Sequence, residues 1–254
     1  MEHTNPLDID HSLSMLVNTS LVDVIAQKIR ANIYSGKYEA GKKLIVRELA
    51  EEFDVSHTPI KDALNRLVAE GYVEAPPRKS MVVRTYSNAS IMDSFHARLM
   101  CECFCAGDII EAAGQHPEIL AKLQEILDQM RKIAGKGEKM SYEAWVENET
   151  LFHGCYMRYC GNDQIYRFYQ TMDINRACYF TYLDTNHSPL RRSVIESNLV
   201  EHQAIVDAIE DLDTEAFLRA VYCHIVRVAE DYAVDDVSRQ RFARFQAYQK
   251  KYNV

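Results

Sequence analysis

The sequence predicts a mainly α-helical protein of two domains, an N-terminal winged helix-turn-helix and a C-terminal all-α helical bundle. Three observations support this fold class. The chain has 254 residues, which is longer than a typical single domain. Its first third contains three short helical patterns followed by two β-rich runs. From residue 90 onward, apolar residues recur at helical spacing throughout.

The first predicted helix begins after Ser20, a good N-cap, and ends at Gly36. Its apolar side contains Val24, Ile25, Ile29 and Ile33. The stretch YEAGKKL that follows predicts a turn, and residues 46–53 (VRELAEEF) predict a short second helix. Residues 54–56 then form a tight connection to a third helix.

The third helix, residues 57–70, has a buried stripe and a polar front. Ser56 can serve as its N-cap, Pro59 fits its first turn, and Gly71 is a C-terminal stop. Its apolar stripe consists of Ala63, Leu64, Leu67 and Val68. Its outward front consists of His57, Thr58, Lys61 and Asn65.

Two β-rich runs follow this helix, residues 72–74 and 81–86, joined by APPRKS. The prolines break regular structure, and the basic residues lie at the tip of the hairpin. Three helices and a basic-tipped hairpin make a winged helix-turn-helix. The polar-fronted third helix is therefore expected to be a recognition helix that enters the major groove of DNA by its N-terminal end.

The remaining chain predicts a helical bundle over residues 90–235 and a charged amphipathic tail over 236–254. Its helices are expected near 90–113, 117–134, 140–159, 163–184, 190–210 and 214–232. Capping residues precede four of them: Ser141, Asn162, Ser188 and Asp213. The domains are thus an N-terminal tail at 1–17, the winged helix-turn-helix at 18–86, the bundle and the C-terminal tail.

Composition and charge restrict the possible function and location. The chain shows neither an export signal nor an apolar run long enough to span a membrane, and its seven cysteines do not form CxxC pairs, so we expect a reducing cytoplasmic location. The net charge is −8, but residues 1–85 carry 11 Lys/Arg against 12 Asp/Glu, which leaves room for a local basic face. Glycine-rich phosphate loops and nucleophile elbows are absent from the sequence.

Four residues of the bundle have the spacing of a metal site. Glu149 and His153 lie four apart and share one face of a helix, and His202 and His224 flank a helix break at 211–213 by similar distances. At about 1.5 Å rise per residue, both imidazoles lie about 15 to 16 Å from that turn, at the same height. Three nitrogens and one oxygen suit Zn²⁺, Ni²⁺ or a similar divalent ion. Hydrogen-bonded bundle histidines are the alternative.

Two further groups of the bundle could carry chemistry. Arg98 could hold a carboxylate by a bidentate pair, but spacing alone favours a surface ion pair with Glu102. The cysteines are expected to be small core residues: Cys101, Cys103, Cys105, Cys155, Cys160, Cys178 and Cys223. Cys223 lies next to His224, so thiolate ligation there is a second possibility.

The run RELAEEFDVSHTPIKDALNRLVAEGYVE resembles the DNA-binding domain of GntR-superfamily transcription regulators. The helical remainder, with its FH…GN and EHQAI…H segments, is similar to the FCD effector domain of the FadR/VanR-type branch, so the likeness covers residues 18 to 235. The resemblance implies DNA contacts from Arg47, Ser56, His57, Thr58 and Lys61, and from the wing tip at Arg78, Lys79 and Ser80. His57 and Lys61 stand where arginines are common in the family, and Ser80 where glycine is usual.

The same resemblance implies a divalent metal held by an acid and three histidines, and an organic-acid effector that completes the coordination. His153, His202 and His224 match those histidines, and Glu149 stands where the family generally has aspartate. Arg98 matches an arginine that faces the ligand, which reverses the preference for an ion pair.

The resemblance thus predicts a homodimeric, ligand-responsive regulator rather than an enzyme. Its partners would be double-stranded operator DNA and a small carboxylate or sugar acid, and release of DNA on effector binding is the expected response. Two rival functions stay open from the sequence: a metal-dependent hydrolase that uses the same four residues, and a protein-interaction module whose winged helix binds another protein.

Overall fold

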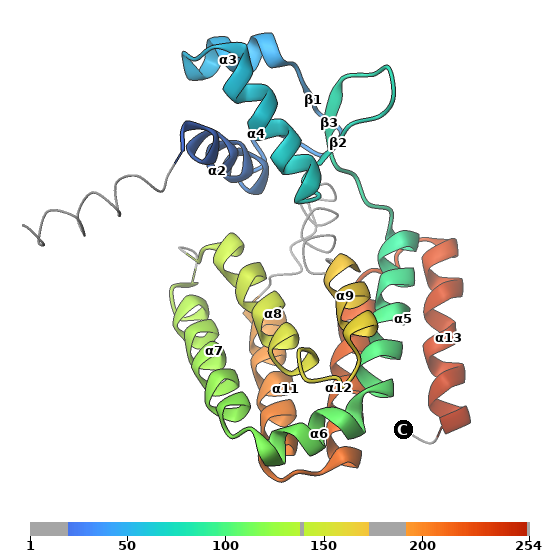
Figure 1. Ribbon diagram of the computed structural model, residues 1–254. Coiled ribbons are helices and arrows are strands. Elements are labelled where there is room, and N and C mark those ends of the chain that lie inside the picture. The colour runs from blue at the N-terminus through green and yellow to red at the C-terminus, as the bar shows by residue number, and fades with distance from the viewer. Residues whose placement is uncertain (1–19, 138–139, 173–191, 253–254) are drawn as a thin grey trace, which may run out of the picture. The chain divides into compact units, whose positions relative to one another are not determined.

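The computed structural model describes residues 20–137, 140–172 and 192–252, and its contacts divide them into two units between Thr85 and Tyr86 (Figure 1). The expected tail at 1–17, the helix-start signal at Ser188 and the thiol of Cys178 lie outside the described residues. Each unit is described by itself below.

The first unit contains the three predicted helices. They are α2 (Leu21–Tyr34), α3 (Val46–Phe53) and α4 (His57–Ala69). The Ser20 hydroxyl caps α2 by accepting from the backbone N–H of Asp23. Apolar faces of α2 and α4 meet in a core that contains Ile29, Ile33, Ile60, Leu64 and Leu67. Val24, expected on the apolar side of α2, is instead half exposed, because it lies at the edge of that stripe.

A three-stranded antiparallel sheet completes this unit. Strand β3 (Met81–Val83) lies between β1 (Lys43–Leu44) and β2 (Val73–Glu74). Val73 pairs with Val83, and Leu44 pairs with Met81. The hairpin of β2 and β3 is the predicted wing, although β3 ends at Val83 rather than at residue 86. Strand β1 lies in the stretch for which the sequence predicts a turn, so that prediction is wrong at these two residues. Two residues are too few to give a periodic signal.

The connection between α3 and α4 is as short as the sequence indicates. Asp54 adopts left-handed backbone angles (φ 52°, ψ 50°) and closes α3, and Ser56 takes the N-cap position of α4. This confirms the predicted N-cap position, although the Ser56 side chain makes no capping hydrogen bond. Gly71 has φ 80° just after α4, which explains why glycine stands at that stop.

The described residues of the second unit form only α-helices and their connections. Its helices are α5 (Asn88–Phe104), α6 (Ala106–Gln115), α7 (Glu118–Ala134), α8 (Tyr142–Met157), α9 (Asp163–Met172), α11 (Arg192–Glu210), α12 (Thr214–Glu230) and α13 (Asp236–Tyr252). Ser141 and Asp213 cap α8 and α12 through their side chains, as predicted. None of the described helices is long and apolar enough to cross a membrane.

One predicted helix is two helices. The sequence indicates a single helix over 90–113, but α5 ends at Phe104 and α6 begins at Ala106, with Cys105 between them. Proline is absent from the junction, and Gly107, two residues past Cys105 in the first turn of α6, is only a weak breaker signal. Cys105 is fully buried there, which fits a bend imposed by packing.

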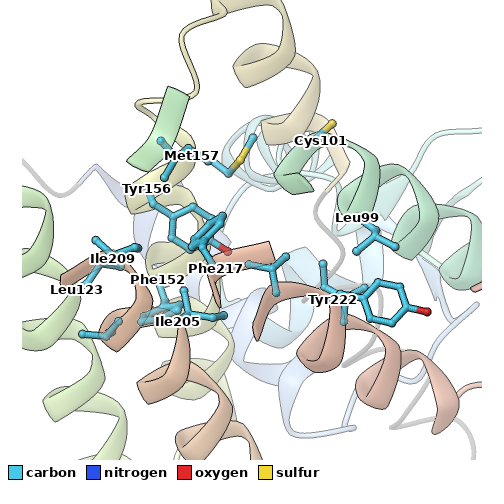
Figure 2. Close-up of a cluster of buried hydrophobic side chains, with 14 of the residues drawn as sticks. Leu99, Cys101, Leu123, Phe152, Tyr156, Met157, Ile205, Ile209, Phe217 and Tyr222 are labelled. Atoms are coloured by element: carbon cyan, nitrogen blue, oxygen red, sulfur yellow. The ribbon is translucent and has the colours of Figure 1, made fainter. Parts of the chain in front are cut away.

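The core of the bundle is formed by α5, α7, α8, α11 and α12 (Figure 2). Phe152, Tyr156, Ile205 and Phe217 are fully buried in it. The ring of Phe152 lies 4.3 Å from that of His202, and the ring of Phe217 lies 5.4 Å from that of Tyr156. Phe152 of this apolar cluster therefore packs directly against His202, one of the histidines with metal-site spacing.

The C-terminal helix α13 packs on α5. Its Phe245 is fully buried, stacks on His96 at 4.1 Å and accepts a hydrogen bond from the Tyr222 hydroxyl through its carbonyl oxygen. Arg241 donates to the Ala89 carbonyl and the Asp93 carboxylate at 2.5 Å each. The charged tail that the sequence predicts is thus part of the bundle.

Candidate functional site

The structure brings together the four residues with metal-site spacing. Glu149 and His153 come from α8, His202 from α11 and His224 from α12, and one ligand atom of each lies within 4.8 Å of all the others. All four side chains are buried. The helical hairpin of α11 and α12 places its two histidines at the same height, as the spacing predicts.

The distances within this cluster fit a shared cation. His153 Nε2 lies 3.2 Å from His202 Nε2, and Glu149 Oε2 lies 3.5 Å from His202 Nε2 and 3.8 Å from His153 Nε2. Bonds of about 2.0 to 2.1 Å to one ion, set at a tetrahedral angle, separate two donor atoms by about 3.4 Å. The donor set of three imidazole nitrogens and one carboxylate oxygen suits Zn²⁺ or Ni²⁺.

Burial sets the protonation of the cluster. It lowers the pKa of His153 to about 4 and holds the pKa values of His202 and His224 well below the ordinary value, so all three imidazoles are neutral at pH 7. Burial also raises the pKa of Glu149 to about 7. Neutral imidazoles and an ionised carboxylate are the forms that bind a divalent ion.

A chain of hydrogen bonds connects His224 to Glu149 on one side of the cluster. His224 Nδ1 donates to Glu201 Oε2 at 2.8 Å, and the guanidinium of Arg227 clamps both oxygens of Glu201. Arg227 also donates to Asn198 Oδ1, and Asn198 Nδ2 donates to Glu149 Oε1 at 3.2 Å. A carboxylate bonded to Nδ1 orients the imidazole so that Nε2 points into the cluster.

A second group of polar residues lies on the other side of His153. Arg98 Nε donates to Glu102 Oε1 at 2.7 Å, and both side chains are buried. The ion pair between Arg98 and Glu102 that spacing predicts is therefore formed, but it is buried and not at the surface. Burial alone would raise the pKa of Glu102, yet the guanidinium of Arg98 beside it holds that pKa below its ordinary value.

A cavity of about 830 Å³ borders this group. Its walls come from α7, α8 and α9, together with Arg98 of α5. Its polar residues include Arg98, His153 and Tyr169, together with charged side chains such as Lys122, Glu125 and Arg158, and Ile119, Ile126, Leu151 and Met172 are among its apolar residues. A cavity of this size that reaches both a buried arginine and a histidine of the cluster can hold a small anionic molecule.

The winged helix-turn-helix exposes the predicted DNA-contacting residues. All seven side chains are exposed: Arg47, Ser56, His57, Thr58, Lys61, Arg78 and Lys79. Arg47 contacts Glu51 only at 4.0 Å, and within the described part of the chain Lys61 makes no ion pair. Arg78 stands at the wing tip with left-handed backbone (φ 61°). These side chains can therefore approach a nucleic acid without first breaking a strong contact.

The cysteines follow the expected pattern with one exception. Cys101, Cys105 and Cys160 are buried, and Cys103 and Cys155 are half-buried. Cys223 is exposed, so its assignment to the core is wrong. The four-residue cluster found among the described residues does not include it, although the neighbouring His224 does belong.

A winged helix-turn-helix joined to a helical domain with a ligand-sized cavity is the organisation of a DNA-binding transcription regulator. Residues 21–83 match the family described as bacterial regulatory proteins, gntR family, and residues 93–227 match the FCD domain. The chain therefore belongs to the GntR family of transcription regulators, in the branch that carries an FCD domain.

Two relatives are similar to the chain over most of its length, and one solved structure shares its fold. The chain is 29% identical to the HTH-type transcriptional regulator YieP of Escherichia coli over 78% of this chain and 89% of that protein. It is 25% identical to the gluconate operon transcriptional repressor of Bacillus licheniformis over 78% and 79% of the two chains. The structure of E. coli McbR/YncC has the same fold, with a TM-score of 0.59, 19% identity and coverage of 91% of this chain and 99% of that one.

The residues that support the four-residue cluster through hydrogen bonds were not identified from the sequence. Tyr156 lies three residues after His153, Arg227 lies three after His224, and Glu201 precedes His202. On helices, the first two spacings place each partner beside its histidine. Asn198 lies four residues before His202 in α11, a spacing that likewise places it on the face of that histidine.

Proposed function

We propose that this protein is a cytoplasmic, homodimeric repressor whose helical domain binds a divalent ion and a small organic acid or sugar acid. The observation that carries the proposal is the buried cluster of Glu149, His153, His202 and His224 beside a cavity that reaches Arg98. Two relatives named as repressors, of a gluconate operon and of a D-xylose utilization operon, support the repressor assignment.

The residues of the chain have separate roles in this function. Glu149 and the three histidines would hold the ion, which when bound supplies a positive charge and open coordination positions for an acid's oxygens. Arg98 would take a carboxylate of the effector by charge-assisted hydrogen bonds. The exposed residues of α3, α4 and the wing would contact DNA, with phosphate contacts giving affinity and base edges giving selectivity.

Regulation requires that the effector bind two arrangements of the dimer unequally. A coupling free energy of about 1 to 3 kcal/mol between effector and operator is typical of such proteins. We expect the effector to favour the arrangement with lower affinity for DNA, so that its binding releases the operator.

Operator binding is the direct test of this function. A fragment from upstream of the protein's own coding region should be bound in a gel shift, selectively over unrelated DNA and more weakly as salt rises. Absence of selective binding would favour the protein-interaction module. Hydrolysis of a carboxylate ester by the metal-loaded protein, lost in His202→Ala, would favour the metal-dependent hydrolase.

Proton release on metal binding tests the state of Glu149. Its pKa of about 7 means that most of the protein carries a proton there at pH 6, whereas His153, with a pKa of about 4, is already neutral. Binding of Zn²⁺ at pH 6 should therefore release about one proton per chain, and this release should approach zero at pH 8.

Calorimetry in two buffers of different ionisation enthalpy measures that proton. The apparent affinity for Zn²⁺ should fall as the pH is lowered below 7, because protonation of Glu149 competes with the ion. In Glu149→Gln the released proton should disappear. Metal binding at pH 6 without proton release would contradict the assignment of Glu149 as a ligand.

A further inference from the structure

Glu102 is a buried carboxylate that none of the roles above requires. It is fully buried in α5 and accepts hydrogen bonds from three side chains that belong to different helices. Tyr156 of α8 donates to its Oε2 at 2.5 Å, and Tyr169 of α9 donates to its Oε1 at 2.7 Å. Arg98, on the same helix as Glu102, provides the third donor.

Tyr156 connects this carboxylate to the candidate ion site. His153 Nδ1 lies 2.5 Å from the Tyr156 hydroxyl oxygen. Because Tyr156 gives its own proton to Glu102, its oxygen can only accept from His153, so Nδ1 carries the hydrogen. The Nε2 atom of His153 then presents its lone pair to the other members of the cluster, 3.2 Å from His202 Nε2.

The other two donors connect the same carboxylate to the cavity. Arg98, Tyr169 and His153 all line the cavity, whereas Tyr156 is fully buried behind it. One carboxylate thus fixes two parts of the cavity wall and, through Tyr156, a histidine of the cluster. Imidazole ligands are usually oriented in this way by a group bonded to the second ring nitrogen.

We infer that Glu102 is a positioning residue that acts through Tyr156 to set the orientation and proton of His153, and so links the cavity wall to the ion site. The inference rests on the ion site proposed above. It assigns a role to Glu102, which is not itself a ligand. Of the two tyrosines that donate to Glu102, Tyr156 connects it to the ion site, and Tyr169 does not.

Two matched tyrosine variants separate the contributions of Tyr156 and Tyr169. Each removes one hydroxyl that donates to Glu102, but only Tyr156→Phe also removes the acceptor of the His153 N–H. Co²⁺ affinity, measured by competition with a chelator, should fall about 10- to 100-fold in Tyr156→Phe and change less than about threefold in Tyr169→Phe. The visible absorption of bound Co²⁺ should change in Tyr156→Phe alone, because it reports the ligand geometry rather than overall stability.

A second variant keeps the test decisive if Tyr156→Phe folds poorly. Glu102→Gln combined with Arg98→Met removes both charges of the buried pair, so no guanidinium is left without its counter-ion. Its Co²⁺ affinity should fall by a similar factor while thermal unfolding stays cooperative. Adding Tyr156→Phe to this variant should cause little further loss, since both changes interrupt one path.

The outcomes distinguish this inference from the proposed function. Wild-type protein that binds no Co²⁺ at the cluster would remove the ion site itself. Wild-type binding together with unchanged affinity and spectrum in folded Tyr156→Phe would overturn the role of Glu102 alone. Equal losses in the two tyrosine variants would also overturn it, because they would indicate general loosening of the bundle.

Discussion

Replacing His153 by alanine should lower the affinity for Zn²⁺ by more than about 100-fold, since a lost ligand costs more than a lost supporting residue. His153 provides one of three nitrogens and is also the member of the cluster that borders the cavity. Its loss should therefore remove bound metal and blunt the response to the effector together. DNA affinity without effector should stay near that of the wild type.

Elemental analysis of the purified protein and operator binding with and without added Zn²⁺ measure these effects. His116→Ala is the matched control, because His116 is an exposed histidine of the same domain and not a member of the cluster; its side chain bonds to Glu118 and contacts the ring of Tyr159. The control should keep its metal. Full metal content in His153→Ala would count against the site.

The sequence predicted the fold class and most of the helices and strands. Amphipathic spacing and capping residues located α2, α3, α4 and α7 within a few residues, because those helices bury one clear apolar stripe. The α5–α6 junction at Cys105 was missed because it depends on contacts with distant helices. Strand β1 was missed because its pairing with β3 is a long-range contact.

The sequence predicted the four candidate ligands but not the residues that hydrogen-bond to them. Glu149 and His153 are related by local helical geometry, and His202 and His224 by a helical hairpin with a visible break, so spacing carries the information. The bond from Tyr156 to Glu102 joins residues 54 positions apart on separate helices. No spacing rule predicts such a contact. The burial of the Arg98–Glu102 pair likewise depends on the helices that cover it.

The two basic residues of the recognition region should have large and separable effects on DNA binding. Arg47→Ala and Lys61→Ala should each weaken operator binding by about 1 to 3 kcal/mol where a base contact is lost. The double variant should lose roughly 2 to 6 kcal/mol if the contacts are independent, as expected for residues on different helices. The fold should survive, because Arg47 is 74% exposed and its contact with Glu51 is long.

Fluorescence anisotropy with the upstream DNA fragment at fixed salt measures these losses, and circular dichroism checks the fold. Lys132→Ala removes the same charge from an exposed position on α7 and should leave operator affinity nearly unchanged. Selectivity distinguishes the kinds of contact, since loss of a phosphate contact weakens all sequences alike and lowers the salt dependence. A folded double variant with wild-type affinity would show that α3 and α4 do not form the DNA-reading surface.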